Sequence, residues 1–288
     1  MVLLRQAYTL NLQTLMKLLL QFLLLAGLFS GTYWGLSQVD WVRILHVEQA
    51  GKRSEEKLGD LIWKNISATE EVVGDQRITR PVDSMVSLLC RANKIERKIK
   101  VHVVRSADIN AFALPGNHLV VLTELIRECD EENELLGVLG HEIAHLEQKH
   151  VMKKLTREIG LSVLLSAGSG GNNPAVIRQA VKILTSTAYD RRLESRADMA
   201  SVDYLLKAGA DPAGFARFLD KIALLQQEEA SYGDWLSTHP ESGSRAEAIR
   251  ARLGKEMRPA GRLFSKDYWQ SFKDAADALE APAPAAGE

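Results

Sequence analysis

The chain has 288 residues, of which 46% are hydrophobic and 25% are charged, with a formal net charge of -1. These values fit one sizeable globular domain with or without appendages, and a chain without excess basic charge is not expected to bind nucleic acid. The only cysteines, Cys90 and Cys129, lie far apart in the sequence and form no Cys-x-x-C metal or redox motif.

An uncharged apolar stretch runs from residue 18 to residue 36. As a helix it would be about 28 Å long, close to the hydrocarbon thickness of a bilayer. Arg5 and Lys17 precede it and no acidic residue does, so the positive-inside rule places the N-terminus in the cytoplasm. Residues 1–37 are therefore predicted to be a transmembrane anchor. A cleaved signal segment is the alternative; it has no good A-x-A-like site, and Ser30-Gly31 is the remaining candidate for cleavage.

The next segments predict a helical connector and a small sheet. Residues 38–80 are polar and helix-prone, and Pro81 is expected to open an amphipathic helix. Three strand-like segments follow, of which the last two should pair antiparallel because a Pro-Gly-Asn turn separates them. They cover residues 99–106, 110–116 and 118–124.

The remaining chain is predicted to be mainly helical. One helix should cover residues 131–159, and another should run from about residue 174 to 208 with a break near Ala188. A glycine-rich loop separates the two helices, and residues 276–288 have the composition of a disordered tail. The predicted fold class is therefore mainly α with a small β-sheet (α+β), and residues 81–275 form its main domain.

His141 and His145 lie four residues apart in the first of these helices. Their side chains should be about 40° apart on one face, so both imidazoles can reach one ion. Glu142 lies beside them on the same side. This is the H-E-x-x-H arrangement, in which two histidines bind zinc and the acid acts as the base.

A catalytic zinc ion needs a third protein ligand and an open position. The extension that ends in a further histidine is excluded, because Gln148 and Val151 stand where glycine and histidine would be required. The alternative is a glutamate on a later helix. Glu194 fits this role, and Asp198, one turn on, could accept a hydrogen bond from a ligating imidazole.

The other histidines have no comparable pattern, with one exception. His239 lies in a Thr-His-Pro loop and could stabilise an oxyanion, close the fourth metal position, or only cap a helix. His150 should point about 140° away from His145 on a continuous helix, so it is expected to be structural. The same expectation applies to His46, His102 and His118.

Four segments together resemble the gluzincin metallopeptidases that include the CAAX prenyl protease, HtpX and related periplasmic quality-control proteases. They read NAFALPG, GHEIAHLEQKH, YDRRLESRADMASVDYLLKAGADP and THPESGSRAEAI. The resemblance implies a zincin-type domain with one Zn²⁺ ion on His141, His145 and Glu194, and with Glu142 as the base. It supports an oxyanion or switch role for His239, with Arg245 nearby.

The resemblance also implies a substrate-binding edge strand. The residues of this strand are Asn110, Ala111, Phe112 and Ala113, and a polypeptide substrate would add to them by main-chain pairing. The prenyl protease and HtpX carry several membrane spans, whereas only one is predicted here, so prenyl processing is not expected.

The expected function is zinc-dependent endopeptide hydrolysis of unfolded or membrane-associated proteins in envelope quality control. The expected location is the bacterial inner membrane, with the catalytic domain in the periplasm, or the periplasm itself after signal cleavage. Two alternatives remain at this stage. One is a latent or non-catalytic, zinc-stabilised chaperone or assembly factor at the membrane, and the other is an aminopeptidase.

Overall fold

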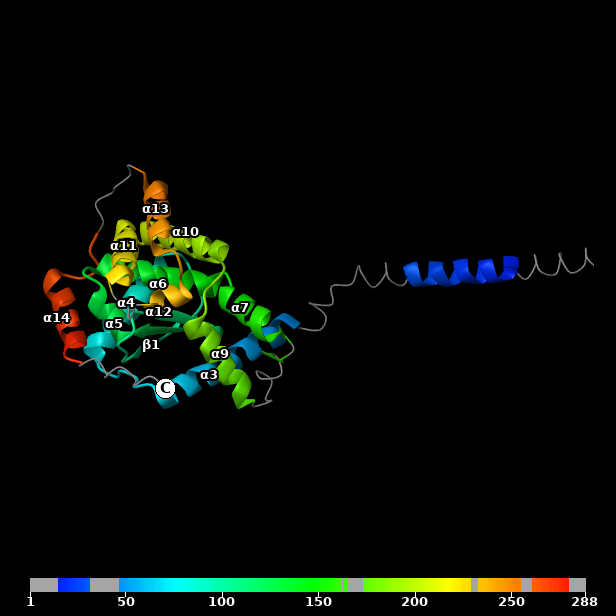
Figure 1. Cartoon of the computed structure of the whole chain (residues 1–288), viewed down its shortest axis with the longest axis horizontal. Coiled ribbons are helices and arrows are strands. Elements are labelled where there is room, and N and C mark those ends of the chain that lie inside the picture. Colours follow the sequence, from blue (N-terminus) through cyan, green and yellow to red (C-terminus); the bar gives the residue numbers. More distant parts are fainter. Residues whose placement is uncertain are drawn as a thin grey trace, which may run out of the picture. The chain divides into compact units, whose positions relative to one another are not determined.

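The structure is a computed structural model that describes residues 15–31, 47–161, 163–164, 173–228, 233–254 and 261–279. The described residues are mostly helical and include one three-stranded sheet (Figure 1). The chain divides into two compact units, Met1–Gly51 and Lys52–Glu288.

In the first unit, residues 15–31 form a helix. Across the part of the chain that the structure describes, every helix is either too short or too polar to cross a membrane. The end of the predicted anchor, from residue 32, and the start of the predicted connector lie outside the described residues.

The second unit contains a small mixed sheet in the order β1-β3-β2. Strand β1 (Lys100–Val104) pairs parallel with β3 (His118–Leu122), and β2 (Ala111–Leu114) pairs antiparallel with β3. The predicted antiparallel pair is thereby confirmed. Because β3 is central, β2 forms one edge of the sheet.

Helices cover both faces of this sheet (Figure 1). Successive strand residues point to opposite faces, so Val103 and Val121 lie on one side and Val104 and Val120 on the other. The hydrophobic cluster on the first side includes side chains of α4, α5, α6, α10, α11, α13 and α14, and the cluster on the second side includes side chains of α3, α7 and α9. Their bounds are α3 (Val47–Thr69), α4 (Gln76–Ala92), α5 (Thr123–Glu128), α6 (Glu132–Glu147), α7 (His150–Ile159), α9 (Pro174–Ser186), α10 (Arg191–Ala208), α11 (Ala213–Glu228), α12 (Gly233–Thr238), α13 (Ser242–Leu253) and α14 (Lys266–Asp277).

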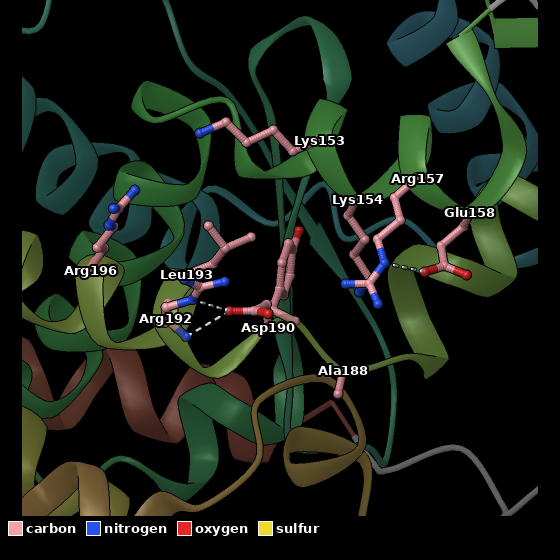
Figure 2. Close-up of a pocket in the computed structure, with 10 residues that line it drawn as sticks. Lys153, Lys154, Arg157, Glu158, Ala188, Asp190, Arg192, Leu193 and Arg196 are labelled. Carbon is pink, nitrogen blue, oxygen red and sulfur yellow. Dashed lines mark hydrogen bonds and ion pairs between the residues drawn. The ribbon is translucent and has the colours of Figure 1, made fainter.

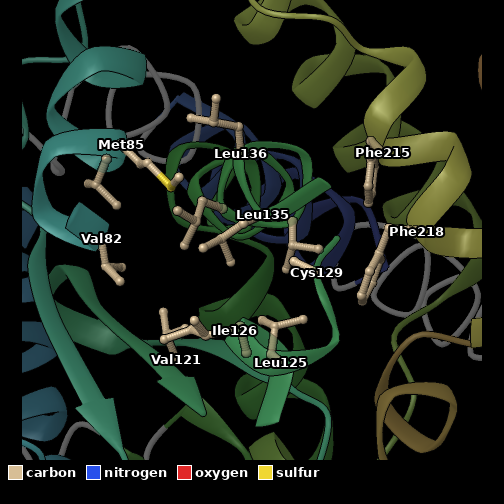
Figure 3. Packing of buried hydrophobic residues seen from close by; sticks show 14 of the residues in the cluster. Val82, Met85, Val121, Leu125, Ile126, Cys129, Leu135, Leu136, Phe215 and Phe218 are labelled. Atoms are coloured by element: carbon tan, nitrogen blue, oxygen red, sulfur yellow. The ribbon is translucent and has the colours of Figure 1, made fainter. Parts of the chain in front are cut away.

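The larger core lies around α6 (Figure 3). Leu135 and Leu136 of this helix pack among side chains of α4, β3, α5 and α11, including Met85, Val121 and Phe218. Each fully buried side chain of this kind stabilises the fold by roughly 1.5–3 kcal/mol. The core therefore fixes α6, which carries the H-E-x-x-H residues, from several sides.

The structure corrects three sequence-based expectations. Helix α4 begins at Gln76 rather than at Pro81, because Asp75 caps it by accepting a hydrogen bond from the Arg77 N–H. The expected helix over residues 131–159 is two helices, α6 and α7, separated at Lys149 by a left-handed backbone with φ of 56°. The connector helix α3 is part of the core, since Leu58, Ile62 and Ile66 are buried.

Candidate active site

Helices α6 and α10 lie side by side and bring the two halves of the site together (Figure 1). Ser201 Oγ of α10 donates a hydrogen bond of 2.7 Å to the Gly137 carbonyl of α6. A Cβ atom at Gly140 would lie 2.7 Å from that Ser201 Oγ, and one at Gly137 would lie 2.3 Å from Phe215. Glycine at position 140 therefore allows α10 to approach α6 closely, and glycine at position 137 allows Phe215 of α11 to pack against the same helix.

Four side chains converge at this contact: His141, His145, Glu194 and His239. Their ligand atoms all lie within 4.8 Å of one another, and all four residues are buried. Nε2 of His145 lies 2.9 Å from Nε2 of His141 and 3.2 Å from Oε1 of Glu194. Nδ1 of His239 lies 3.3 Å from Nε2 of His141 and 3.1 Å from Oε2 of Glu194. We call these four residues the metal cluster.

The donor set of the metal cluster fits a single divalent ion. Ligand atoms about 2.0–2.1 Å from a tetrahedral zinc ion lie about 3.3 Å apart, which is close to the spacings above. Imidazole nitrogen and carboxylate oxygen are both usual zinc ligands. The structure thus brings together His141, His145 and Glu194 as predicted, and it places His239 beside them as a fourth donor, which is one of the alternatives that the sequence left open.

Two residues of opposite charge, Asp198 and Arg245, lie beside the metal cluster. Asp198 Oδ1 lies 2.9 Å from His141 Nδ1, on the side of the ring that faces away from the cluster. Arg245 donates to both oxygens of Asp198 at 2.8 and 2.7 Å, and its Nη1 lies 2.8 Å from Glu194 Oε2. Burial alone would raise the pKa of Asp198, but the Arg245 guanidinium and His141 lower this pKa to about 2. Asp198 is therefore held as a carboxylate.

Glu142 lies between the metal cluster and the edge strand β2. Its Oε2 accepts a 2.9 Å hydrogen bond from the Ala113 N–H, and its Oε1 lies 3.4 Å from Nε2 of His239. Burial, together with the negative charge of Glu194, raises the pKa of Glu142 well above its usual value. A carboxyl group in this environment can take up a proton near neutral pH.

The proposed edge-strand residues all lie at this side of the site. Ala111, Phe112 and Ala113 belong to β2, and Asn110 immediately precedes it. Asn110 Nδ2 donates to Thr238 Oγ1 at 3.4 Å, so the start of the strand contacts the segment that carries His239. All four residues are buried.

The segment from α12 to His239 covers the metal cluster. The His239 N–H donates to the Trp235 carbonyl at 2.7 Å, and the two rings pack with their centroids 4.4 Å apart. Arg245 Nη1 donates to the His239 carbonyl at 3.3 Å. Glu142 and the three histidines of the site are 0% exposed, so the site is closed to solvent in this arrangement.

Two contacts of His145 could not be foreseen from helical spacing. His150 Nδ1 lies 3.1 Å from His145 Nδ1, because the chain bends at Lys149 and the expected rotation of about 140° does not apply. The Tyr189 ring packs against His145 with centroids 4.2 Å apart. The expected direction of the His150 side chain, away from His145, is therefore wrong. The polar Gln148-Lys149 pair after the last apolar residue was the available signal for a helix end.

His102 and His118 lie elsewhere, between the sheet and α3. His118 Nδ1 lies 2.9 Å from His102 Nε2, and His118 Nε2 lies 3.0 Å from Asp60 Oδ1. Trp63 of α3 stacks on the His102 ring at 3.7 Å. Both histidines therefore make structural contacts, as expected, whereas His46 lies outside the described residues.

Residues 75–253 of the chain match the sequence pattern of peptidase family M48. The chain is 28% identical over 230 residues to the beta-barrel assembly-enhancing protease of Yersinia pestis, covering 74% of this chain and 46% of that protein. It is 25% identical over 228 residues to the protein of the same name from Escherichia coli (strain K12), covering 75% and 47%. It is also 30% identical over 164 residues to metalloprotease LoiP of E. coli K12, covering 55% and 64%. The matches to the two assembly-enhancing proteases thus span about half of the length of those relatives.

Proposed function

The chain belongs to peptidase family M48, and we propose that it is a zinc-dependent endopeptidase that hydrolyses peptide bonds of unfolded or membrane-associated proteins. The observation that carries this proposal is the convergence of His141, His145 and Glu194 beside Glu142. Two imidazoles and a carboxylate leave one position for water on a four-coordinate ion, which is the usual arrangement of a catalytic zinc site.

The bound ion would polarise the scissile carbonyl and lower the pKa of its water ligand toward about 7. In the proposed reaction, Glu142 takes a proton from the water and passes it to the leaving amine. The Ala113 N–H holds one oxygen of Glu142 at 2.9 Å, and the other oxygen faces the cluster side. Glu142 is thus oriented between the edge strand, where the peptide would bind, and the proposed metal ligands.

We propose two roles for His239, and the residue cannot perform both at the same time. Its Nδ1 lies among the donors of the metal cluster, so it would close the fourth position in the resting enzyme. When a substrate enters, His239 would leave that position and donate a hydrogen bond to the oxyanion. The substrate would add to β2 at Asn110, Ala111, Phe112 and Ala113 by main-chain pairing.

We further propose that the protein acts in envelope quality control on the periplasmic side of a bacterial inner membrane. The support for quality control is the similarity to proteins named beta-barrel assembly-enhancing proteases. The support for the location is the uncharged sequence of residues 18–36, preceded by Arg5 and Lys17. The mass of the N-terminal peptide from purified protein distinguishes an intact anchor from a cleaved signal.

The test of the proposed activity uses the whole chain with Glu142→Gln and, as a matched control, Glu247→Gln on the exposed face of α13. Wild type and the control should each contain one zinc ion per chain and degrade casein. Glu142→Gln should keep the zinc and lose at least a thousandfold of the activity, because the base is absent. Casein degradation by Glu142→Gln at the wild-type rate would reject the proposal for Glu142.

The complete burial of the metal cluster favours a second candidate, a latent or non-catalytic assembly factor that uses the ion for stability. For this candidate, chelation would lower the melting temperature while wild type cleaves no peptide under any condition. Peptides with an acetylated N-terminus distinguish an endopeptidase from an aminopeptidase, because an aminopeptidase would not cleave them.

A further inference from the structure

A basic pocket opens between α7 and the start of α10 (Figure 2). It has a volume of about 380 Å³. Five basic side chains line it, against two acidic ones, Glu158 and Asp190. The basic residues are Lys153, Lys154 and Arg157 from α7 and Arg192 and Arg196 from α10. A formal excess of three positive charges therefore surrounds this pocket, on a chain whose net charge is -1.

One aromatic ring separates the basic pocket from the metal cluster. Tyr189 lines the pocket, and its ring packs against His145 at 4.2 Å and against His239 at 5.8 Å between centroids. Leu193, which also lines the pocket, immediately precedes the proposed ligand Glu194. A peptide held at the metal cluster could therefore place a neighbouring side chain in the pocket.

Lys154 is the buried cation of this pocket, with only 6% of its surface exposed. Its ammonium group donates to the Thr187 carbonyl and lies 4.0 Å from the centre of the Tyr189 ring. Within the described part of the chain, no carboxylate forms an ion pair with Lys154. Burial lowers its pKa to about 8, although the negative charges of Glu194, Glu142 and Glu158 oppose this shift. A buried charge is costly unless it is paired, so an incoming carboxylate would be favoured here.

Further cationic side chains at the rim of the pocket are available to interact with an anion. Arg157 contacts Glu158 and Arg192 contacts Asp190, each at 3.7 Å, and both arginine side chains are highly exposed (Figure 2). Pairs of this length and exposure are weak. Arg196 forms no ion pair with any residue that the structure describes. These side chains can therefore steer an anion toward Lys154.

We propose that the basic pocket is a substrate subsite for a peptide carboxylate, and that Lys154 is its specificity-determining residue. This inference rests on the proposed peptidase function. The carboxylate belongs either to an acidic side chain near the scissile bond or to the C-terminus of the substrate chain. Both sources share the same chemistry, and peptides that vary them separately distinguish the two.

The test uses internally quenched peptides based on a casein site that the zinc-loaded whole chain cleaves. Each peptide carries Glu or its uncharged isostere Gln at one position near the cleaved bond, with a C-terminal acid or amide. We expect kcat/KM to be at least tenfold higher for Glu, or for the C-terminal acid, at one position. Lys154→Met should reduce this preference to less than threefold. Lys207→Met, an exposed lysine on α10, should retain it.

A binding measurement separates failure of this inference from failure of the proposed function. In the Glu142→Gln background, a fluorescent acidic peptide should bind at least fivefold more tightly than its Gln counterpart, and Lys154→Met should abolish the difference. If Lys154→Met does not fold, the double change Arg192→Gln and Arg196→Gln on the exposed rim should lower the preference at least threefold. A binding preference without any cleavage would support the subsite and overturn the peptidase proposal. Equal cleavage and equal binding of Glu and Gln peptides at every position would overturn the subsite.

Discussion

Asp198 Oδ1 lies 2.9 Å from His141 Nδ1, while Nε2 of the same imidazole faces the metal cluster. This contact fixes the orientation of the ring and keeps the proton on Nδ1, so the Nε2 lone pair remains free for a metal. An amide at position 198 would hold the ring less firmly and leave Arg245 with Glu194 as its remaining carboxylate partner. The contact therefore predicts a specific effect on metal affinity.

We predict that Asp198→Asn weakens zinc binding by about 10–100-fold, the usual effect of losing such an outer contact. Competition with a fluorescent zinc chelator measures the dissociation constant. Asp203→Asn is the matched control, because Asp203 lies on the same helix and pairs at the surface with Arg252. An unchanged dissociation constant in Asp198→Asn would reject the outer-contact role.

A second prediction concerns Glu194 itself. Glu194→Ala removes one candidate ligand and should lower the zinc content measured by atomic spectroscopy from one ion per chain to well below half at micromolar protein. Ser195→Ala, on the exposed side of the same helical turn, should leave it unchanged. Full zinc occupancy in Glu194→Ala would show that the histidines hold the ion without this carboxylate.

The sequence was most informative where the relevant geometry is local. His141 and His145 share one helix, and so do Glu194 and Asp198, so helical spacing alone predicted which side chains point the same way. The pairing of one helix with the other came from the family resemblance. The segment that forms β3 was likewise predicted to be a strand, whereas its burial on both faces depends on the helices that cover the sheet.

The features of the site that the sequence did not predict depend on contacts between distant segments or on an unusual backbone conformation. Lys149 adopts a left-handed conformation that non-glycine residues seldom take, so the polar Gln148-Lys149 pair could mark a helix end but not the bend that brings His150 to His145. Tyr189 meets His145 only because the chain between α9 and α10 crosses the end of α6. Lys154 lies over the Tyr189 ring in the basic pocket for the same reason.

The left-handed backbone of Lys149 predicts a stabilising substitution. Glycine adopts φ of 56° without steric strain, so Lys149→Gly should raise the free energy of unfolding by up to about 1 kcal/mol. Lys153→Gly, inside α7, should lower it by about 1 kcal/mol. Urea denaturation followed by circular dichroism measures both. Destabilisation by Lys149→Gly would mean that the lysine side chain contributes more than the backbone strain removes.

The histidine pair under α3 predicts how stability depends on pH. Burial, followed by the nearby positive groups His118 and Lys100, lowers the pKa of His102 to about 4. The pKa of His118 is also lowered, chiefly by burial and Lys100, although Asp60 opposes this shift. Both pKa values are below the usual value near 6.5 of an unfolded chain, so the unfolded state binds the protons more readily. This contribution to stability is fully present above pH 6.5 and is lost as the pH falls toward 4.

We therefore predict that His102→Gln loses less stability than wild type when the pH falls from 7 to 4.5. The difference between the two losses should be about 1 kcal/mol, because partial exposure of His102 reduces the effect of its pKa shift. Tryptophan fluorescence in urea gradients measures the unfolding, and Trp63, which stacks on His102, contributes to this signal. Taking the difference at each pH removes the contribution of titrating groups that His102 does not contact, including the proposed zinc ligands, and leaves the combined contribution of His102 and its neighbour His118. Parallel stability curves for wild type and His102→Gln would show that His102 is not protonated on unfolding in this range, and the loss of stability would then have to come from other groups.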